Sequence, residues 1–396
     1  MIPFNKPYMT GKELWNIAQA HVNGHLAGDG PFTNKCHDWL EQTIGSDKAL
    51  LTHSCTAALE IAANLLDLEP NDEVIMPSYT FVSTANAFVS QGATPVFVDI
   101  RPDTLNIDET KIERAITEKT RAIVPVHYSG VGCDMDTIMS IANRHGLIVI
   151  EDAAQGVMAS YKDKPLGGIG QLGTLSFHET KNIIAGEGGA LLINDPTFIE
   201  RAKIIREKGT NRDAYFRGVV DKYTWVDTGS SYLPGEIIAA FLYAQIQEAE
   251  EITSRRIGMW NTYHHEFASL ESRGLCRRHF IPDYCKHNAH MYYLLLNSIE
   301  DRDRLICTLK EMGIQAVFHY IPLHSSPAGK KFARTSGNMS FTDDLSQRLV
   351  RLPLWVGLED KIVDIADTVK NIIKETTNTK HSTPPCTGYP ILHNEQ

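Results

Sequence analysis

Short runs of apolar residues recur between about residues 46 and 195, and stretches with helical spacing separate several of them. These runs do not alternate with polar residues, which indicates strands that are buried on both faces. Helical connections between strands favour parallel pairing. The last apolar runs follow one another without long helices, so the strands that they form can pair in part antiparallel. The pattern predicts a mostly parallel sheet of seven strands, at residues 49–51, 74–76, 95–98, 122–126, 147–150, 174–177 and 190–193.

The sheet belongs to a predicted large domain that spans residues 31–249 and ends with helices at 196–208 and 236–251. An N-terminal arm, residues 1–30, precedes it. In this arm we expect an amphipathic helix at residues 13–25, because Leu14, Ile17, Ala18 and Val22 follow helical spacing.

Helices mixed with short strands indicate a smaller C-terminal α+β domain at residues 250–375. Its predicted elements include strands at 292–296 and 316–318 and a last helix at 360–374. Residues 376–396 are polar and have no periodic pattern, so we expect a disordered or weakly docked tail.

Composition narrows the class of protein. The chain has no apolar run of the ~18 residues that a membrane span needs, and it does not begin with the residue order of a signal peptide, so we expect no membrane span and a cytoplasmic location. The seven cysteines are scattered and form no CxxC pair, which indicates neither a disulfide framework nor a zinc site. A net charge of -10 argues against nucleic-acid binding, but a local site for a small phosphorylated molecule remains compatible with it.

Two carboxylates, Glu151 and Asp152, follow the apolar run at 147–150. In an open α/β sheet the ligand crevice lies at the carboxyl ends of the strands, so Asp152 can face a ligand there. The alternative is that Asp152 only caps the start of a helix.

The segment from His53 to Glu60 follows the first strand and opens a predicted helix. Unpaired backbone N–H groups and the positive end of the helix dipole favour a phosphate at such a start, and Ser54 and Thr56 add hydroxyl donors. Simple helix capping by Ser54 or Thr56 is the alternative.

An aromatic residue and a lysine also follow strands. Phe81 comes after the strand at 74–76, where its ring can stack on a flat ligand or pack in the core. Lys181 comes after the strand at 174–177 and precedes the glycine-rich stretch 186–189. Since most lysines are solvated surface charges, Lys181 alone indicates little.

Other motifs are set aside. Residues 168–173 match the pattern GxGxxG, yet they precede a strand instead of opening a helix after one, so a dinucleotide site is not predicted. The histidine pairs lack the frame of a metal site, so we expect no metal and interpret these histidines as structural or close to the substrate; the pairs are His21/His25, His287/His290 and His319/His324.

Together, a helix N-terminus, an acid, an aromatic ring and a lysine stand at strand ends of one predicted sheet. A cofactor that carries a phosphate, a protonated ring nitrogen, a flat face and an aldehyde needs these four features. We therefore expect pyridoxal 5'-phosphate, which uses a Schiff-base lysine and an acid on the pyridine nitrogen.

The sequence also resembles the DegT-type sugar-nucleotide aminotransferases, whose fold is the fold-type I architecture of pyridoxal phosphate enzymes. The resemblance covers about residues 2–373 and rests on the segments 28–31, 53–59, 77–81, 151–155, 176–182 and 186–189. It implies that Lys181 forms the Schiff base and that Asp152 holds the pyridine nitrogen protonated. By the same resemblance Gln155 contacts the ring hydroxyl, Phe81 stacks on the ring, and the phosphate is bound by Cys55, Thr56 and Ser176.

The sequence departs from the family pattern at two places. Cys55 stands where the family often has glycine, which should be tolerated because the backbone N–H group binds the phosphate. The common Gly-x-Asn-x-Arg segment reads Gly-Ser-Ser-Tyr-Leu at residues 229–233, so a phosphate contact from the neighbouring subunit falls to Ser231.

Within the family, residues 176–182, 209–212 and 221–227 look like those of enzymes that move an amino group from L-glutamate to a dTDP-4-keto-6-deoxy-hexose. The resemblance implies a homodimer or higher homo-oligomer. Three alternatives are an enzyme acting at C3, one acting on a UDP sugar, and a non-catalytic regulator that binds pyridoxal phosphate. A dehydratase is disfavoured, because family members with that activity replace the lysine by histidine, whereas Lys181 is present.

Overall fold

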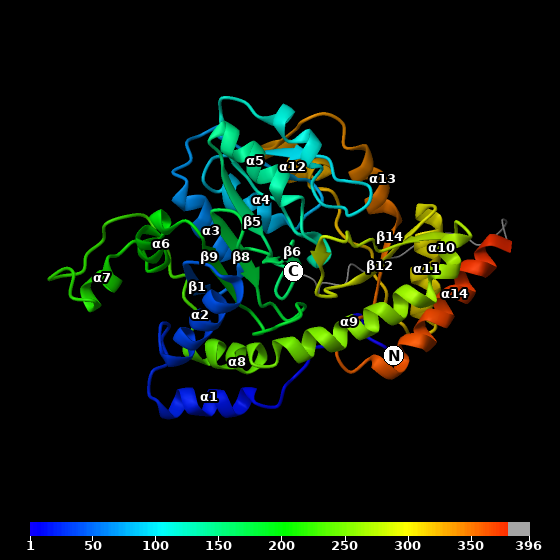
Figure 1. Cartoon of the computed structure of the whole chain (residues 1–396), viewed down its shortest axis with the longest axis horizontal. Helices are drawn as coiled ribbons and strands as arrows, with labels where there is room; N and C mark the ends of the chain where they lie inside the picture. Colours follow the sequence, from blue (N-terminus) through cyan, green and yellow to red (C-terminus); the bar gives the residue numbers. More distant parts are fainter. Residues whose placement is uncertain (379–396) are drawn as a thin grey trace.

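Eight strands form the main sheet of the computed structural model, which describes residues 1–378, in the order β1-β9-β8-β5-β4-β2-β3-β13 (Figure 1). All seven predicted strands are present, and the expected mostly parallel α/β sheet is confirmed. Their bounds are β1 (Lys48–Thr52), β2 (Glu73–Pro77), β3 (Thr94–Val98), β4 (Thr120–Ile123), β5 (Ile148–Asp152), β8 (Leu172–Ser176) and β9 (Gly189–Ile193). β9 runs antiparallel to both of its neighbours, β1 and β8, as the missing helical connections allowed.

The eighth strand, β13 (Arg334–Thr335), was not predicted. It comes from the C-terminal part of the chain and pairs in parallel with β3 at the sheet edge. An ion pair fixes this contact, because the Nε atom of Arg334 lies 2.6 Å from a carboxylate oxygen of Glu73 on β2. The C-terminal region therefore completes the sheet of the large domain.

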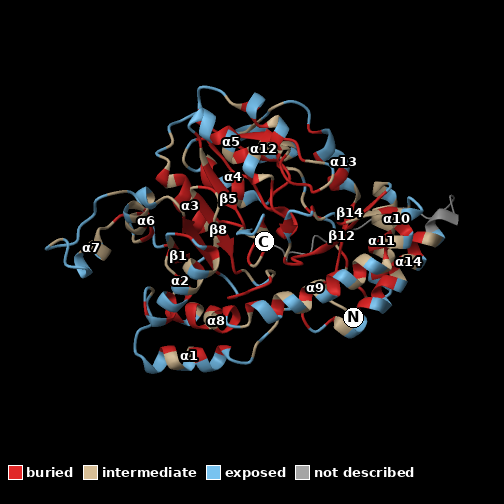
Figure 2. Ribbon diagram, in the orientation of Figure 1, coloured by how far each residue is buried: buried red, intermediate tan, exposed pale blue. Residues whose placement is uncertain are grey.

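Helices cover both faces of the sheet. Figure 2 shows the strands of the sheet coloured mostly as buried. Successive residues of β1 illustrate why. Leu50 packs with the apolar side of α3 (Cys55–Leu65), whereas Leu51 belongs to the core on the other face, with Leu40 of α2 (Pro31–Ile44). Most residues of these strands are thus buried on one face or the other, which is why the strands read as apolar runs.

A second, antiparallel sheet lies in the C-terminal part, in the order β10 (Cys276–Arg278), β12 (Tyr292–Leu296) and β14 (Leu349–Leu352). It packs with α9 (Ala249–Glu266), α11 (Ile299–Glu311) and α14 (Ile362–Asn378) around a separate apolar core. The strand predicted at 292–296 is confirmed. The one predicted at 316–318 is wrong, since Val317 forms only a single bridge, to Arg351, before the chain turns at Tyr320, whose φ is 36°.

Two helix predictions need correction. The helix expected at 236–251 is two helices, α8 (Glu236–Ile246) and α9, and α9 crosses the expected domain limit at residue 249. Helix α14 continues to Asn378 and so includes the first three residues of the predicted tail, 376–378, and residues 379–396 lie outside the described part of the chain. The domain limits themselves stay predictions.

Helix α1 (Glu13–Val22) lies along α8, but with a different face from the one expected. Leu14 and Val22 are 80% and 74% exposed, whereas Glu13, Asn16 and Ala20 are buried. The reason is hydrogen bonding: the amide of Asn16 donates to the carbonyl of Ala240, and Gln245 donates to Glu13. None of the helices in residues 1–378 is long and apolar enough to cross a membrane.

Candidate active site

One cavity opens at the carboxyl ends of the parallel strands, and Lys181 lines it. This lysine lies in the loop between β8 and β9. Its backbone N–H group donates to the carbonyl of His178 over 2.9 Å, and that of Glu179 donates to the carbonyl of Gly186 over 2.8 Å. The loop is therefore a closed turn, and Lys181 has a fixed place at the end of β8.

Side chains from a distant part of the sequence hold this loop. The amide of Asn182 donates to the carbonyl of Asn288 over 2.8 Å, and its oxygen lies 3.1 Å from Nδ1 of His290. The guanidinium of Arg256 donates to the carbonyls of residues 289 and 290. Burial, together with the positive charge of Lys181, lowers the pKa of His290 well below its usual value, so His290 is neutral here.

Asp152, at the end of β5, is 5% exposed and lines the same cavity. One carboxylate oxygen accepts the hydroxyl of Thr84 over 2.7 Å, and the other accepts the backbone N–H of Ala154 over 3.1 Å. The arrangement suits a carboxylate that faces a cationic partner.

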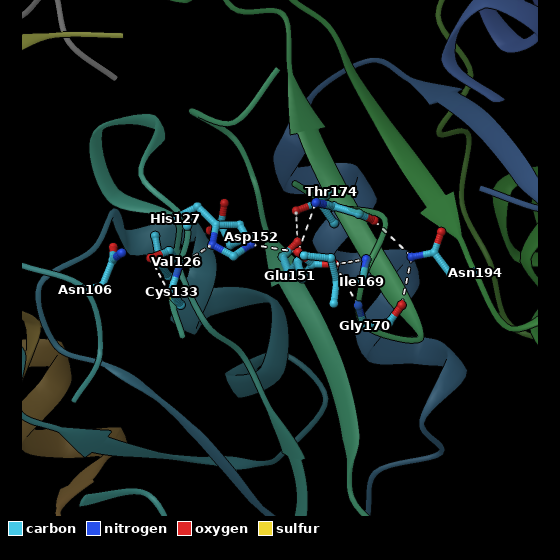
Figure 3. A network of polar contacts seen from close by, with 12 residues as sticks. Asn106, Val126, His127, Cys133, Glu151, Asp152, Ile169, Gly170, Thr174 and Asn194 are labelled. Carbon is cyan, nitrogen blue, oxygen red and sulfur yellow. Dashed lines mark hydrogen bonds and ion pairs between the residues drawn. The ribbon is translucent and has the colours of Figure 1, made fainter. Parts of the chain in front are cut away.

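Glu151 has a different environment, shown in Figure 3. Its carboxylate accepts the backbone N–H groups of Gly167, Ile169 and Gly170 at 2.6–3.0 Å. It also lies 2.8 Å from Nε2 of His127. Since the other ring nitrogen of His127 accepts the N–H of Cys133, Nε2 carries the hydrogen and donates to Glu151. The glycine-rich stretch that matches a dinucleotide motif thus binds a carboxylate of its own chain.

The N-terminus of α3 faces the cavity with Cys55 and Thr56. Ser54 caps the helix by accepting the N–H of Ala57 over 3.1 Å, while the first N–H groups of a helix have no partner inside it. Ser176, the last residue of β8, lines the cavity beside them. Burial, reinforced by the charge of Asp152, raises the pKa of the Cys55 thiol, so Cys55 is uncharged there.

Gly189 permits this approach of α3 to β9. A Cβ atom at this position would lie 2.4 Å from the backbone nitrogen of Cys55, closer than real contacts allow. The glycine pattern that follows Lys181 therefore has a direct structural reason.

Aromatic and amide side chains line the remaining wall. Phe81 is 37% exposed and its ring centroid lies 6.5 Å from that of Tyr320. Gln155 donates to the hydroxyl of Tyr320 over 3.2 Å and accepts the N–H of Ser129 over 2.6 Å. Phe81 thus has an open face toward the cavity, and Gln155 is held in place.

Seven of the eight site residues predicted from sequence line this one cavity: Cys55, Thr56, Phe81, Asp152, Gln155, Ser176 and Lys181. Ser231 is exposed and does not line it. Its neighbour Tyr232 accepts the N–H of His53 over 2.9 Å, so Ser231 lies near the start of α3 on the outside. The roles of all eight residues stay predictions.

Sequence reasoning missed several cavity residues, including His290, His319 and Tyr320. The nitrogen Nδ1 of His319 lies 2.8 Å from the hydroxyl of Tyr128, and the ring of His319 stacks on that of Tyr320 at 3.6 Å. Both histidines belong to pairs that the sequence indicated to be structural or close to the substrate, without naming them as site residues. Within residues 1–378, no group of three or more His, Cys, Asp or Glu side chains could hold a metal ion.

The donor set fits pyridoxal phosphate. A helix N-terminus with the hydroxyls of Thr56 and Ser176 suits the dianionic phosphate, and the two-donor carboxylate of Asp152 suits a protonated ring nitrogen. The exposed face of Phe81 suits a flat ring, and Lys181 supplies the amine.

Comparisons with known proteins agree with this assignment. The family model described as the DegT/DnrJ/EryC1/StrS aminotransferase family matches residues 7–370. The uncharacterized protein MJ1066 of Methanocaldococcus jannaschii is 38% identical over 87% of this chain and 91% of its own. The spore coat polysaccharide biosynthesis protein SpsC of Bacillus subtilis is 33% identical over 94% of this chain and 97% of its own.

Solved structures are similar over nearly the whole chain. Spr1654 of Streptococcus pneumoniae, whose name assigns it to the sugar aminotransferases, has in its PMP-form a TM-score of 0.88 and 26% identity, over 95% of this chain and 100% of its own. Its PLP-form gives a TM-score of 0.87 at 25% identity, over 94% of this chain and 99% of its own. The predicted fold type I and the predicted cofactor, pyridoxal 5'-phosphate, are confirmed. The chain belongs to the DegT/DnrJ/EryC1/StrS aminotransferase family and is a pyridoxal phosphate-dependent sugar aminotransferase.

Proposed function

We propose that this protein transfers the amino group of L-glutamate to a dTDP-4-keto-6-deoxy-hexose, giving dTDP-4-amino-4,6-dideoxygalactose and 2-oxoglutarate. The observation that carries the transfer itself is that Lys181 and Asp152, on separate strand ends, line one cavity with the start of α3. The choice of sugar rests on the resemblance of residues 176–182, 209–212 and 221–227 to enzymes of this specificity. By that resemblance the product serves enterobacterial common antigen, and the polysaccharide named for SpsC supports a role of this kind.

When bound, pyridoxal phosphate supplies a ring that withdraws electrons from the amino-bearing carbon. The carboxylate of Asp152 keeps the ring nitrogen charged, and Thr84 keeps that carboxylate in place. Backbone N–H groups at the start of α3, with Thr56 and Ser176, bind the phosphate. With the cofactor bound, the Nζ atom of Lys181 would take a proton from the Cα atom of glutamate and deliver it to the cofactor carbon that receives the amino group, which requires the neutral amine. Amino donor and keto acceptor then occupy the site in turn.

The cavity has room for two bound molecules. Its volume is about 1690 Å³, larger than the ~300–1,000 Å³ of ordinary small-molecule sites. It reaches from Lys181 to Arg302 and Lys310 on α11, which are cationic groups able to attract a diphosphate. This size and charge support a nucleotide sugar as the second substrate.

A homodimer or higher homo-oligomer is part of the proposal. The segment 209–232, which includes α7 (Arg212–Phe216), projects away from the body of the molecule (Figure 1). It carries Phe216 and Trp225, which are 69% and 77% exposed. Large apolar side chains on a projecting segment favour burial against a second copy. Ser231, at the base of this segment, is our candidate for a phosphate contact across the interface. A cytoplasmic location stays a prediction.

A substrate panel tests the proposal. The purified protein with pyridoxal phosphate and glutamate is incubated with 3-keto and 4-keto sugars linked to dTDP or UDP, and NMR identifies the amino product. We expect the 4-amino dTDP sugar with the galacto configuration. A product aminated at C3, or a preference for UDP sugars, would favour the corresponding alternative. An absorption band that does not change when glutamate is added, with cofactor bound, would favour the regulator.

A further inference from the structure

Two threonine hydroxyls lead to the carboxylate of Asp152. The Oγ1 atom of Thr84 lies 2.7 Å from Oδ2 of Asp152, and the Oγ1 atom of Thr80 lies 2.8 Å from that of Thr84. All three side chains are buried, with exposed fractions of 0% for Thr84, 2% for Thr80 and 5% for Asp152. They form a short hydrogen-bonded chain that ends at the cavity.

The direction of this chain follows from the chemistry of its members. An ionised carboxylate only accepts hydrogen bonds, so the single hydroxyl hydrogen of Thr84 points to Asp152. The oxygen of Thr84 then accepts the hydroxyl hydrogen of Thr80. Because hydroxyls in such a chain polarise one another, Thr80 strengthens the bond from Thr84 to Asp152.

The turn that carries Thr84 also touches the other parts of the site. Thr84 lies in the first turn of α4 (Val82–Val89), whose N-cap is Phe81. The hydroxyl of Ser83 lies 2.8 Å from that of Thr56 at the start of α3. One helical turn thus connects the residues proposed to meet the ring face, the ring nitrogen and the phosphate of the cofactor.

We propose that Thr84 is a positioning residue, which aims the carboxylate of Asp152 at the ring nitrogen of the cofactor, and that Thr80 supports it. This inference rests on the proposed role of Asp152. Without the hydroxyl of Thr84, the carboxylate keeps only the N–H of Ala154 and rotates away from the ring nitrogen for part of the time. The ring then holds its proton for a smaller fraction of molecules.

The test compares Thr84→Val, which keeps the shape but removes the hydroxyl, with Thr84→Ser, which keeps the hydroxyl. Thr262→Val on α9 is the matched control, because Thr262 is half-buried outside the cavity lining and its hydroxyl donates to the carbonyl of Gly258. Each variant is loaded with pyridoxal phosphate alone, and its absorption band is followed against pH. The absorption band reports the proton on the Lys181 nitrogen. A ring that has lost its own proton repels this proton less, so the pH midpoint of the band should rise in Thr84→Val. Thr84→Ser and Thr262→Val should keep the midpoint of the parent protein.

Two further measurements sharpen the test. The glutamate half-reaction should slow about 10-fold in Thr84→Val, since a hydrogen bond to a charged group is lost. Thr80→Val should give a smaller change in the same direction. An unchanged midpoint and rate in folded Thr84→Val overturn the inference, and so does an equal defect in Thr84→Ser. If the parent protein itself makes no amino sugar, the proposed function fails, while the midpoint still tests Thr84.

Discussion

Glu151 and Asp152 are neighbours at the end of β5, yet their carboxylates have no partner in common. Glu151 is fully buried and accepts the backbone N–H groups of residues 167, 169 and 170 as well as His127. Asp152 faces the cavity and accepts the hydroxyl of Thr84. This follows from strand geometry, because successive side chains point to opposite faces of a sheet. The same two-residue motif therefore has one structural and one chemical member.

Replacing Glu151 by glutamine should lower the free energy of unfolding by about 3 kcal/mol. The NH2 group of the glutamine would face backbone N–H donors, and the negative charge that those donors stabilise would be lost. Urea denaturation measures it, with Glu250→Gln at an exposed position as the control. An unchanged unfolding free energy in Glu151→Gln would show that the glycine loop does not depend on this carboxylate.

Replacing Asp152 by asparagine should reduce the reaction rate much more than the stability, which is the reverse of the effect expected for Glu151→Gln. The glutamate half-reaction should slow about 100-fold, since the charge that stabilises the cationic ring is lost. The unfolding free energy should change less than in Glu151→Gln, because Asp152 borders the cavity and its carboxylate has two donors where that of Glu151 has four. Stopped-flow absorbance gives the rate, and a rate within a few-fold of the parent would exclude Asp152 as the partner of the ring nitrogen.

Gly189→Ala should weaken cofactor binding about 10-fold, because the new methyl group collides with the backbone of residues 54 and 55. Equilibrium dialysis with pyridoxal phosphate measures the dissociation constant. Gly258→Ala, where an added Cβ meets nothing within 4 Å, is the matched control. Equal affinities in both variants would contradict the close contact between β9 and α3.

Acid should destabilise the C-terminal region through histidines around Trp260. Burial lowers the pKa of His287 to about 4, and it also lowers the pKa values of His264 and His279. Since the folded pKa of His287 is below its unfolded one, the stability that it contributes is present above about pH 6.5 and is lost as pH falls toward 4, by ~1.4 kcal/mol per pH unit. His264 and His279 act in the same direction.

His287→Phe keeps a ring against Trp260 but cannot titrate. Its unfolding free energy should therefore fall less steeply between pH 6.5 and 4 than that of the parent protein. Denaturation at several pH values checks this, and parallel curves for the two proteins would show that His287 does not contribute.

The sequence was sufficient to predict those elements whose own residues form a recognisable local pattern, such as a run of apolar residues. The long strands are buried on both faces. Asp152 ends β5 and Lys181 follows β8 in the loop to β9, and because β5 and β8 pair in parallel, both residues lie at the same edge of the sheet. Strand β13 has two residues and depends on an ion pair across the sheet edge, and no local pattern reveals it.

The parts that could not be predicted depend on distant contacts. His290 and Tyr320 reach the cavity from more than 100 residues beyond Lys181, through hydrogen bonds to Asn182 and Gln155. The buried face of α1 is set by hydrogen bonds to α8, which overrule the spacing of its apolar residues. Thr84 looks like an ordinary helix residue until the fold brings Asp152 beside it.

The most direct test of the account is reduction of the cofactor-loaded protein with borohydride, followed by denaturation and mass measurement. The parent protein and Lys164→Ala, a variant of an exposed lysine, should retain the cofactor covalently. Lys181→Ala should retain none and should form no amino sugar, with its fold intact by circular dichroism. Covalent retention or normal turnover in Lys181→Ala would contradict the assignment of Lys181 as the lysine that holds pyridoxal phosphate.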